Sequence, residues 1–290
     1  MNERDYSDQI PSNEFSKLTT FLRPLWSRVV GLEITSEACL KQITGLLVPL
    51  WIRGDTPNSA RSLIIEDLNN YEENGIIRAP FYWNRRKIAT RDRFNSFFET
   101  LQNLRLHDII LRSWDSPVYH GLAELHLYLC NISCSVKQSK MYNILMKCPK
   151  LRFLKIIGVE VTTEPEFLPA PVSLNELDTF CLQPDDSLHH PEEACQILPL
   201  IAKGSNSLIM SLELGHGSSD QSFSTLVSDF LSRSNVETLY ACNSHHNPIG
   251  SIAALLTHMP CLRTLVLSFP NLADGSLETF LSQHRSNPDP

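Results

Sequence analysis

The stretch Leu122–Ile132, LAELHLYLCNI, constrains the fold more than any other part of the sequence. It fills every specified position of the pattern L-x-x-L-x-L-x-x-N/C-x-L. The leucines at positions one, four and six point into a core from one short strand, and Cys130 at position nine can lie inside the turn that follows. One match could arise by chance, so the interpretation depends on whether the pattern recurs.

The same spacing recurs along the chain, and most recurrences follow a stretch with helical periodicity. Phe94, Phe97, Phe98 and Leu101, for example, share one helical face before the strand pattern around Leu104. This recurrence is typical of leucine-rich repeats. The residues predicted at the fourth position of successive strands are Leu32, Leu63, Leu104, Leu125, Leu154, Phe180, Leu212, Leu239 and Leu265.

Strands that alternate with helices and share one crossover hand form a parallel sheet with helices on its outer side. We therefore predict an α/β leucine-rich-repeat solenoid, with a curved parallel sheet on the concave side and helices on the convex side. A doubly wound α/β sheet also alternates strands and helices. That alternative does not require leucine at positions one, four and six of every strand.

Three local expectations follow from the same frame. In the seventh unit, Ile209, Leu212 and Leu214 are predicted at positions one, four and six. Pro49 is expected to stop the first helix of the array, and Pro199 to kink or end a later one, because proline lacks the backbone donor that a helix interior needs.

The bulk properties limit the compartment and the domain plan. We expect a polar, flexible lead-in over residues 1–20, about nine repeats over 21–284 and a polar tail over 285–290. The net charge of -7 argues against nucleic acid as the partner. With no apolar leader and no run of about eighteen apolar residues, we predict a soluble intracellular protein, cytoplasmic or nuclear, with free thiols and no membrane contact.

Two segments resemble the leucine-rich-repeat regions of fungal F-box-like proteins: Leu46–Ile65, LLVPLWIRGDTPNSARSLII, and Arg105–Leu127, RLHDIILRSWDSPVYHGLAELHL. The resemblance covers roughly Phe21–Leu281. In that family an amino-terminal F-box holds a Skp-type adaptor of a cullin ubiquitin ligase, and the repeats select the substrate. The resemblance therefore implies substrate recognition for such a ligase, with the adaptor and cullin complex as further partners.

The chain departs from that family where the F-box is expected. Val29 already begins a repeat, which leaves no room for a complete three-helix box. A freestanding leucine-rich-repeat scaffold without a ubiquitin-ligase link is therefore the alternative. The positions that resemble the opening of an F-box are Ile10, Pro11, Glu14, Phe15, Leu18 and Leu22.

We expect no catalytic site, no metal and no cofactor. The segment Leu214–Ser219, LGHGSS, has Gly217 where a nucleophile elbow needs serine, so a turn is the better interpretation. Cys242 with His245 and His246 lacks a four-ligand zinc pattern. The same is true of Cys130, Cys134 and Cys148.

The segment Arg78–Arg93, RAPFYWNRRKIATRDR, carries six basic residues and one acidic residue beside three aromatic ones. Such a segment can hold single-stranded nucleic acid or an acidic protein. The alternative, which we favour, is a solvated loop whose aromatic side chains fold back over the edge of the solenoid. Of the two binding interpretations, an acidic protein comes first, because no RNA-binding motif accompanies the patch.

The residues between the core positions of each strand face the opposite side of the sheet. Aromatic and cationic side chains on such a surface are frequent anchors of protein interfaces. We predict a protein partner on the concave face, bound by Arg105, His126, Tyr128, Phe153 and Lys155, with Tyr240 further along. Glu213, predicted at position five, would interrupt the basic run. A register shift by one residue would exchange the two faces.

Overall fold

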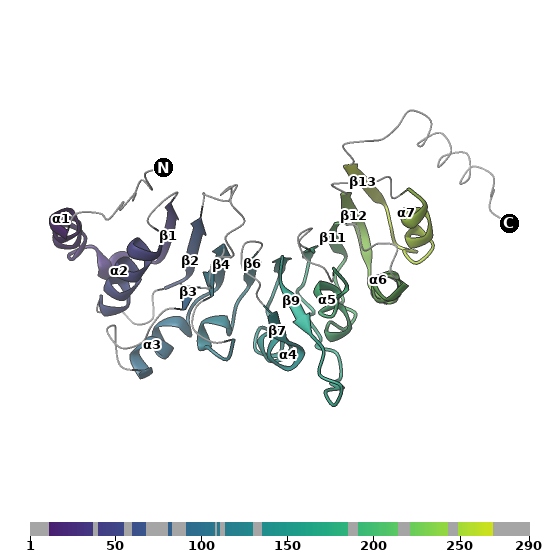
Figure 1. Cartoon of the computed structure of the whole chain (residues 1–290), viewed down its shortest axis with the longest axis horizontal. Coiled ribbons are helices and arrows are strands. Elements are labelled where there is room, and N and C mark those ends of the chain that lie inside the picture. The colour runs from purple at the N-terminus through teal and green to yellow at the C-terminus, as the bar shows by residue number, and fades with distance from the viewer. Residues whose placement is uncertain are drawn as a thin grey trace, which may run out of the picture. The chain divides into compact units, whose positions relative to one another are not determined.

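The computed structural model describes residues 12–36, 40–54, 60–67, 81–82, 91–107, 109–110, 114–129, 135–184, 191–213, 221–242 and 249–268. The chain divides into two compact units, Met1–Ile132 and Ser133–Pro290. In both units, a helix separates most consecutive strands of the larger sheet along the chain (Figure 1).

In the described part of the first unit, four strands of the larger sheet are parallel and lie in chain order, β1-β2-β4-β6. Residues 12–20 of the predicted flexible lead-in lie in helix α1. The elements of this unit are α1 (Ser12–Leu22), η1 (Trp26–Arg28), β1 (Gly31–Ser36), α2 (Leu40–Arg53), β2 (Ser62–Asp67), β3 (Phe81–Tyr82), α3 (Arg91–Phe98), β4 (Asn103–His107), β5 (Ile109–Ile110), η3 (Pro117–Tyr119) and β6 (Glu124–Tyr128).

The fourth-position leucines of the first unit form one continuous row across the sheet. Leu32 pairs with Leu63, Leu63 with Leu104, and Leu104 with Leu125. The last three are 0% exposed. Burial of each leucine contributes about 1.5–3 kcal/mol, so this row and the parallel sixth-position row hold the unit together. The predicted spacing is confirmed for these strands.

Helices α2 and α3 supply the aromatic part of the same core. The rings of Trp51 and Phe97 meet edge to face at 4.8 Å, and the indole nitrogen of Trp51 donates to the carbonyl of Val29 at 2.8 Å. The prediction that Pro49 stops α2 is wrong, because the helix continues to Arg53. Burial of Trp51 and Ile52 beyond the proline offsets the roughly 3 kcal/mol cost of proline in a helix.

The basic insertion Arg78–Arg93 contributes a strand to the first unit. Phe81 and Tyr82 form β3, which pairs in parallel with Ile109 and Ile110 of β5. We expected a loop with aromatic residues folded back over an edge. Two of those aromatic residues instead join a second, short ladder. Residues 78–80 and 83–90, which carry four of the six basic residues, lie outside the described ranges.

Among the described residues of the second unit, five strands of the larger sheet are parallel and again lie in chain order, β8-β10-β11-β12-β13. A second ladder pairs β7 with β9 in parallel. The elements of this unit are β7 (Ser135–Lys137), α4 (Gln138–Met146), β8 (Phe153–Ile157), β9 (Glu160–Thr162), β10 (Thr179–Gln183), α5 (Pro191–Cys195), η4 (Leu198–Leu200), β11 (Leu208–Glu213), α6 (Gln221–Arg233), β12 (Val236–Cys242), α7 (Ile249–Leu256) and β13 (Thr264–Ser268).

Helix α6 packs on the buried side of the second sheet. The rings of Phe180 on β10 and Phe230 on α6 lie 5.7 Å apart. Pro199 acts as predicted, because α5 ends at Cys195 and a separate short 3-10 helix contains the proline. No helix within the described ranges is long and apolar enough to cross a membrane.

The predicted register of the seventh strand is wrong by two residues. Met210, not Leu212, pairs with Phe180 and Leu239 and occupies the fourth position, so Leu212 occupies the sixth. Ile209, predicted in the core, is 42% exposed. The shift moves Leu212 from position four to position six, which are both core positions, but it moves Ile209 from position one to position three, on the opposite face. Leu214 lies outside the described ranges.

Candidate protein-binding surface

Each unit has one sheet face that its helices do not fill. In β4, β6 and β10, the residues at positions four and six are buried, and those at positions three, five and seven are half-exposed. We call the face formed by positions three, five and seven the open face. The side chains on it are the ones that the fold leaves accessible to a partner.

In the first unit, Arg105 and His126 are direct neighbours on β4 and β6. The guanidinium Nη2 of Arg105 lies 3.5 Å from Oε2 of Glu124, which occupies position three of β6. The side chain of Arg105 is 42% accessible and that of Glu124 is 35% accessible. An ion pair this exposed contributes about 0–1 kcal/mol to stability, so it leaves the charges available for recognition.

Tyr128 forms an aromatic pair on the same face. It is the direct cross-strand neighbour of His107, and the two ring centroids lie 4.1 Å apart at an interplanar angle of 69°. Both residues are half-exposed. The structure therefore brings three predicted residues, Arg105, His126 and Tyr128, together on two adjacent strands.

In the second unit, Phe153 and Lys155 occupy positions three and five of β8. Phe153 pairs with Thr179, and Lys155 pairs with Cys181. Tyr240, at position five of β12, is 46% exposed. Strands β10 and β11 separate Tyr240 from β8, so the structure does not bring Tyr240 beside the other two predicted residues.

Cys181 adds no charge to this surface. Burial raises the pKa of its thiol above the ordinary value, although a hydrogen bond with Ser211 and the charge of Lys155 act in the opposite direction. The thiol is therefore protonated near neutral pH.

Two side chains at position seven of their strands are buried, although position seven belongs to the open face. Ile157, at position seven of β8, is only 4% exposed. Glu213 lies at position seven of β11, beside Cys242, and is 6% exposed. Because the seventh strand is shifted, Ser211 takes position five, and no accessible carboxylate interrupts the row at that position.

The sequence alone did not point to two further residues of the open face. Glu124 is the ion-pair partner of Arg105. It is the third residue of the repeat that begins at Leu122, so the sequence would have identified it if position three had been included in the open face. Ile209 was assigned to the core by the incorrect register, and comparison of Met210 with Phe180 in the preceding strand was the signal that could have corrected this.

The described residues contain no group of three or more His, Cys, Asp or Glu that could hold a metal ion. Cys148 is buried, and the thiol of Cys242 contacts the carbonyl of Leu212 at 3.8 Å. The remaining candidates, His245, His246, Cys130, Cys134 and the segment LGHGSS, lie outside the described ranges. That the chain has neither a metal nor a catalytic site stays a prediction.

Comparison of the chain with protein-family models and with curated proteins gives no match.

Proposed function

We propose that this chain is a leucine-rich-repeat solenoid that binds a protein partner on the open, concave face of its sheet. The observation that carries the proposal is the pair of strands β4 and β6. Their leucines are fully buried, and the same strands present Arg105, His126 and Tyr128 on the open face.

The solenoid assignment is supported by three features found in each unit. Every neighbouring pair of sheet strands is parallel, the strand order follows the chain, and the core positions align in rows. Stacked repeats have these features, because each repeat contacts only its neighbours.

The binding role is supported by the chemistry of the open face. Arginine and tyrosine are enriched among the residues that dominate binding energy at protein interfaces. Here their side chains contribute little to the core. The exposed Arg105–Glu124 pair gives almost no stability, so a role in recognition accounts for these residues better than a role in folding.

We further propose, from the resemblance to F-box-like proteins, that the partner is a substrate of a ubiquitin ligase. Helix α1 supports a second contact with an adaptor protein, because Leu18 and Phe21 lie one turn apart on it and are 39% and 69% exposed. The alternative is a freestanding scaffold. It is favoured by strand β1, since Gly31–Ser36 pairs with β2 where a complete F-box would continue as helix.

A matched pair of double variants tests the binding role. Tyr128→Ala with Lys155→Ala removes one aromatic and one cationic side chain from the open face. Tyr142→Ala with Lys147→Ala removes the same two types from helix α4 and from its C-cap. The first variant is expected to weaken binding of the co-purified partner about tenfold or more, and the second to leave it unchanged. If the first variant keeps both its affinity for the partner and its unfolding temperature, the partner does not bind on the open face.

A purified Skp-type adaptor tests the ligase role. Binding of the adaptor to the chain, weakened by Phe21→Ser, supports the ligase. Failure of the adaptor to bind, with the open-face partner still bound, supports the freestanding scaffold.

A further inference from the structure

Three apolar side chains on the open face of the second unit are exposed and adjacent. They are Ile209 on β11, Tyr240 on β12 and Val266 on β13, which are 42%, 46% and 38% exposed. Tyr240 pairs directly with Val266, and Ile209 pairs with Thr238, two residues before Tyr240 on the same face. We call these three residues the apolar surface. Contiguous exposed apolar side chains rimmed by polar ones are typical of interaction sites.

The surroundings of the apolar surface carry little accessible charge. Positions three, five and seven of β11–β13 otherwise carry Ser211, Thr238, Thr264, Ser268, Cys242 and Glu213. Glu213 is 6% exposed and lies two positions beyond Ser211, so it offers little charge to a partner. At the start of β12, Glu237 lies 3.8 Å from the guanidinium of Arg263, so the charges at that border offset each other.

The first unit differs in its chemistry. Its open face carries the Arg105–Glu124 ion pair together with Glu33, Glu66, His107 and His126. A protein segment that binds there meets charges of both signs. A segment that binds β11–β13 meets hydroxyl groups and apolar carbon.

We infer that β11–β13 bind an uncharged, apolar segment of the protein partner, with Tyr240 at the centre of the contact. The inference rests on the proposed function, since it specifies which part of the partner this portion of the open face accepts. A charged segment is disfavoured, because its ions would lose water without gaining a counter-charge from the surface. Central interface regions are likewise depleted in charge and enriched in aromatic residues.

A displayed library of random peptides provides a defined probe. The wild-type chain selects binding clones, and each clone is then measured against three variants of the full chain. Tyr240→Thr with Val266→Thr removes two of the three side chains of the apolar surface and places β-branched residues, which suit strands, at both positions. Val266→Lys adds a charge at an exposed position. Leu168→Ser removes an apolar side chain that is 91% exposed in the segment after β9, outside the strands.

The inference predicts a group of clones that bind the first two variants about tenfold more weakly and Leu168→Ser equally well. These clones are expected to be poor in Asp, Glu, Lys and Arg, and their affinity to change little with salt concentration. Thermal unfolding of each variant tests whether the loss of binding comes from unfolding of the chain.

Two outcomes separate the inference from the proposal on which it rests. Clones that depend on Tyr240 and Val266 but are rich in charge overturn the inference and leave the proposed function standing. Clones that are weakened only by the Tyr128→Ala and Lys155→Ala double variant do the same. Selected clones that are insensitive to every substitution on the open face overturn both.

Discussion

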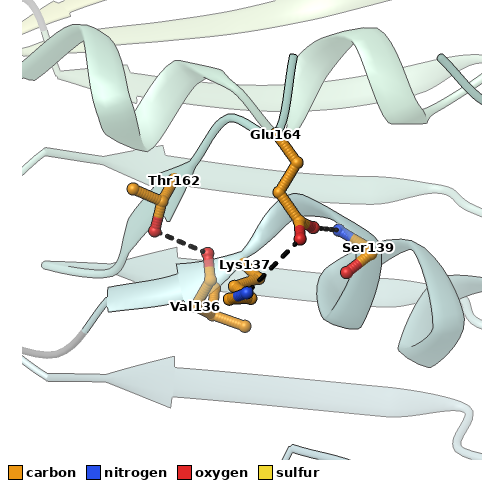
Figure 2. Close-up of polar contacts among 5 residues, drawn as sticks. All are labelled: Val136, Lys137, Ser139, Thr162 and Glu164. Carbon is orange, nitrogen blue, oxygen red and sulfur yellow. Dashed lines mark hydrogen bonds and ion pairs between the residues drawn. The ribbon is translucent and has the colours of Figure 1, made fainter. Parts of the chain in front are cut away.

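The carboxylate of Glu164 accepts a hydrogen bond from the backbone N–H of Ser139 at 3.0 Å, across 25 residues of chain. Ser139 lies in the first turn of α4, where the N-cap residue Lys137 makes no side-chain cap. Glu164 therefore satisfies one of the unpaired donors at this helix end and places negative charge at the positive end of its dipole. Lys137 adds an ion pair at 3.5 Å, and Thr162 donates to the carbonyl of Val136 at 3.4 Å (Figure 2).

Glu164→Gln is expected to make the stability of the second unit less dependent on acid pH. Hydrogen bonds from Ser139, together with the charge of Lys137, hold the pKa of Glu164 below its ordinary value in the folded chain. The stabilisation is therefore complete above the unfolded-state pKa and is lost as the pH falls through the lower folded-state pKa. Unfolding measured across this acid range should show a steeper loss in the wild type than in the variant.

Glu166→Gln is the matched control for that measurement, because Glu166 is an exposed carboxylate two residues away. Its pH profile should follow the wild type. Equal slopes for the wild type and Glu164→Gln would contradict the capping role of Glu164.

Arg105→Ala and Leu125→Ala are expected to differ sharply in their effect on stability. Replacing Arg105 removes an exposed ion pair with Glu124, which lowers the free energy of unfolding by less than about 1 kcal/mol. Leu125 is 0% exposed, and its truncation leaves a cavity that costs about 3 kcal/mol. Urea unfolding of the two variants measures the difference. A cost above 2 kcal/mol for Arg105→Ala, on the order of a core residue, would mean that the open face serves folding.

Arg233→Met is expected to destabilise the second unit by about 2 kcal/mol. The guanidinium donates to the carbonyls of Ile201 and Leu198, the latter at 2.6 Å, and lies 5.2 Å from the ring centroid of Phe230. Methionine keeps the length of the side chain but leaves these carbonyls without their donor.

Arg263→Met is the matched control, since Arg263 is exposed and forms only a long ion pair, 3.8 Å, with Glu237. Its expected cost is about 0–1 kcal/mol by denaturant unfolding. Equal costs for the two arginines would show that the carbonyl contacts of Arg233 are not stabilising.

The sequence predicted the strands well, because a leucine that must be buried every few residues leaves few alternatives. Leu63, Leu104 and Leu125 lie in one row as expected. The prediction from sequence failed at Pro49, because the burial of Trp51 and Ile52 further along the helix stabilises it by more than the proline destabilises it. It could not predict the Glu164 cap of α4, which depends on how a distant segment folds back.

The candidate surface was predictable only where the register was secure. Around the perfect repeat at Leu122, Arg105, His126 and Tyr128 occupy the expected face. In the seventh strand a methionine replaces the leucine of the fourth position, so the pattern matched Leu212 instead. Ile209 and Glu213 were therefore assigned to the wrong positions of the repeat. The flexible side chain of methionine fills the same core site, which a search for leucine does not detect.

The corrected register leads to a last prediction, on two adjacent residues of β11. Met210 is 0% exposed and Ile209 is 42% exposed. Met210→Lys buries an unpaired charge and is expected to unfold the second unit, whereas Ile209→Lys places its ammonium group in water and should change stability by about 0.5 kcal/mol or less. The register predicted from sequence requires the opposite for Ile209. Far-ultraviolet circular dichroism with thermal unfolding distinguishes the two registers, and a strongly destabilised Ile209→Lys would restore Ile209 to the core.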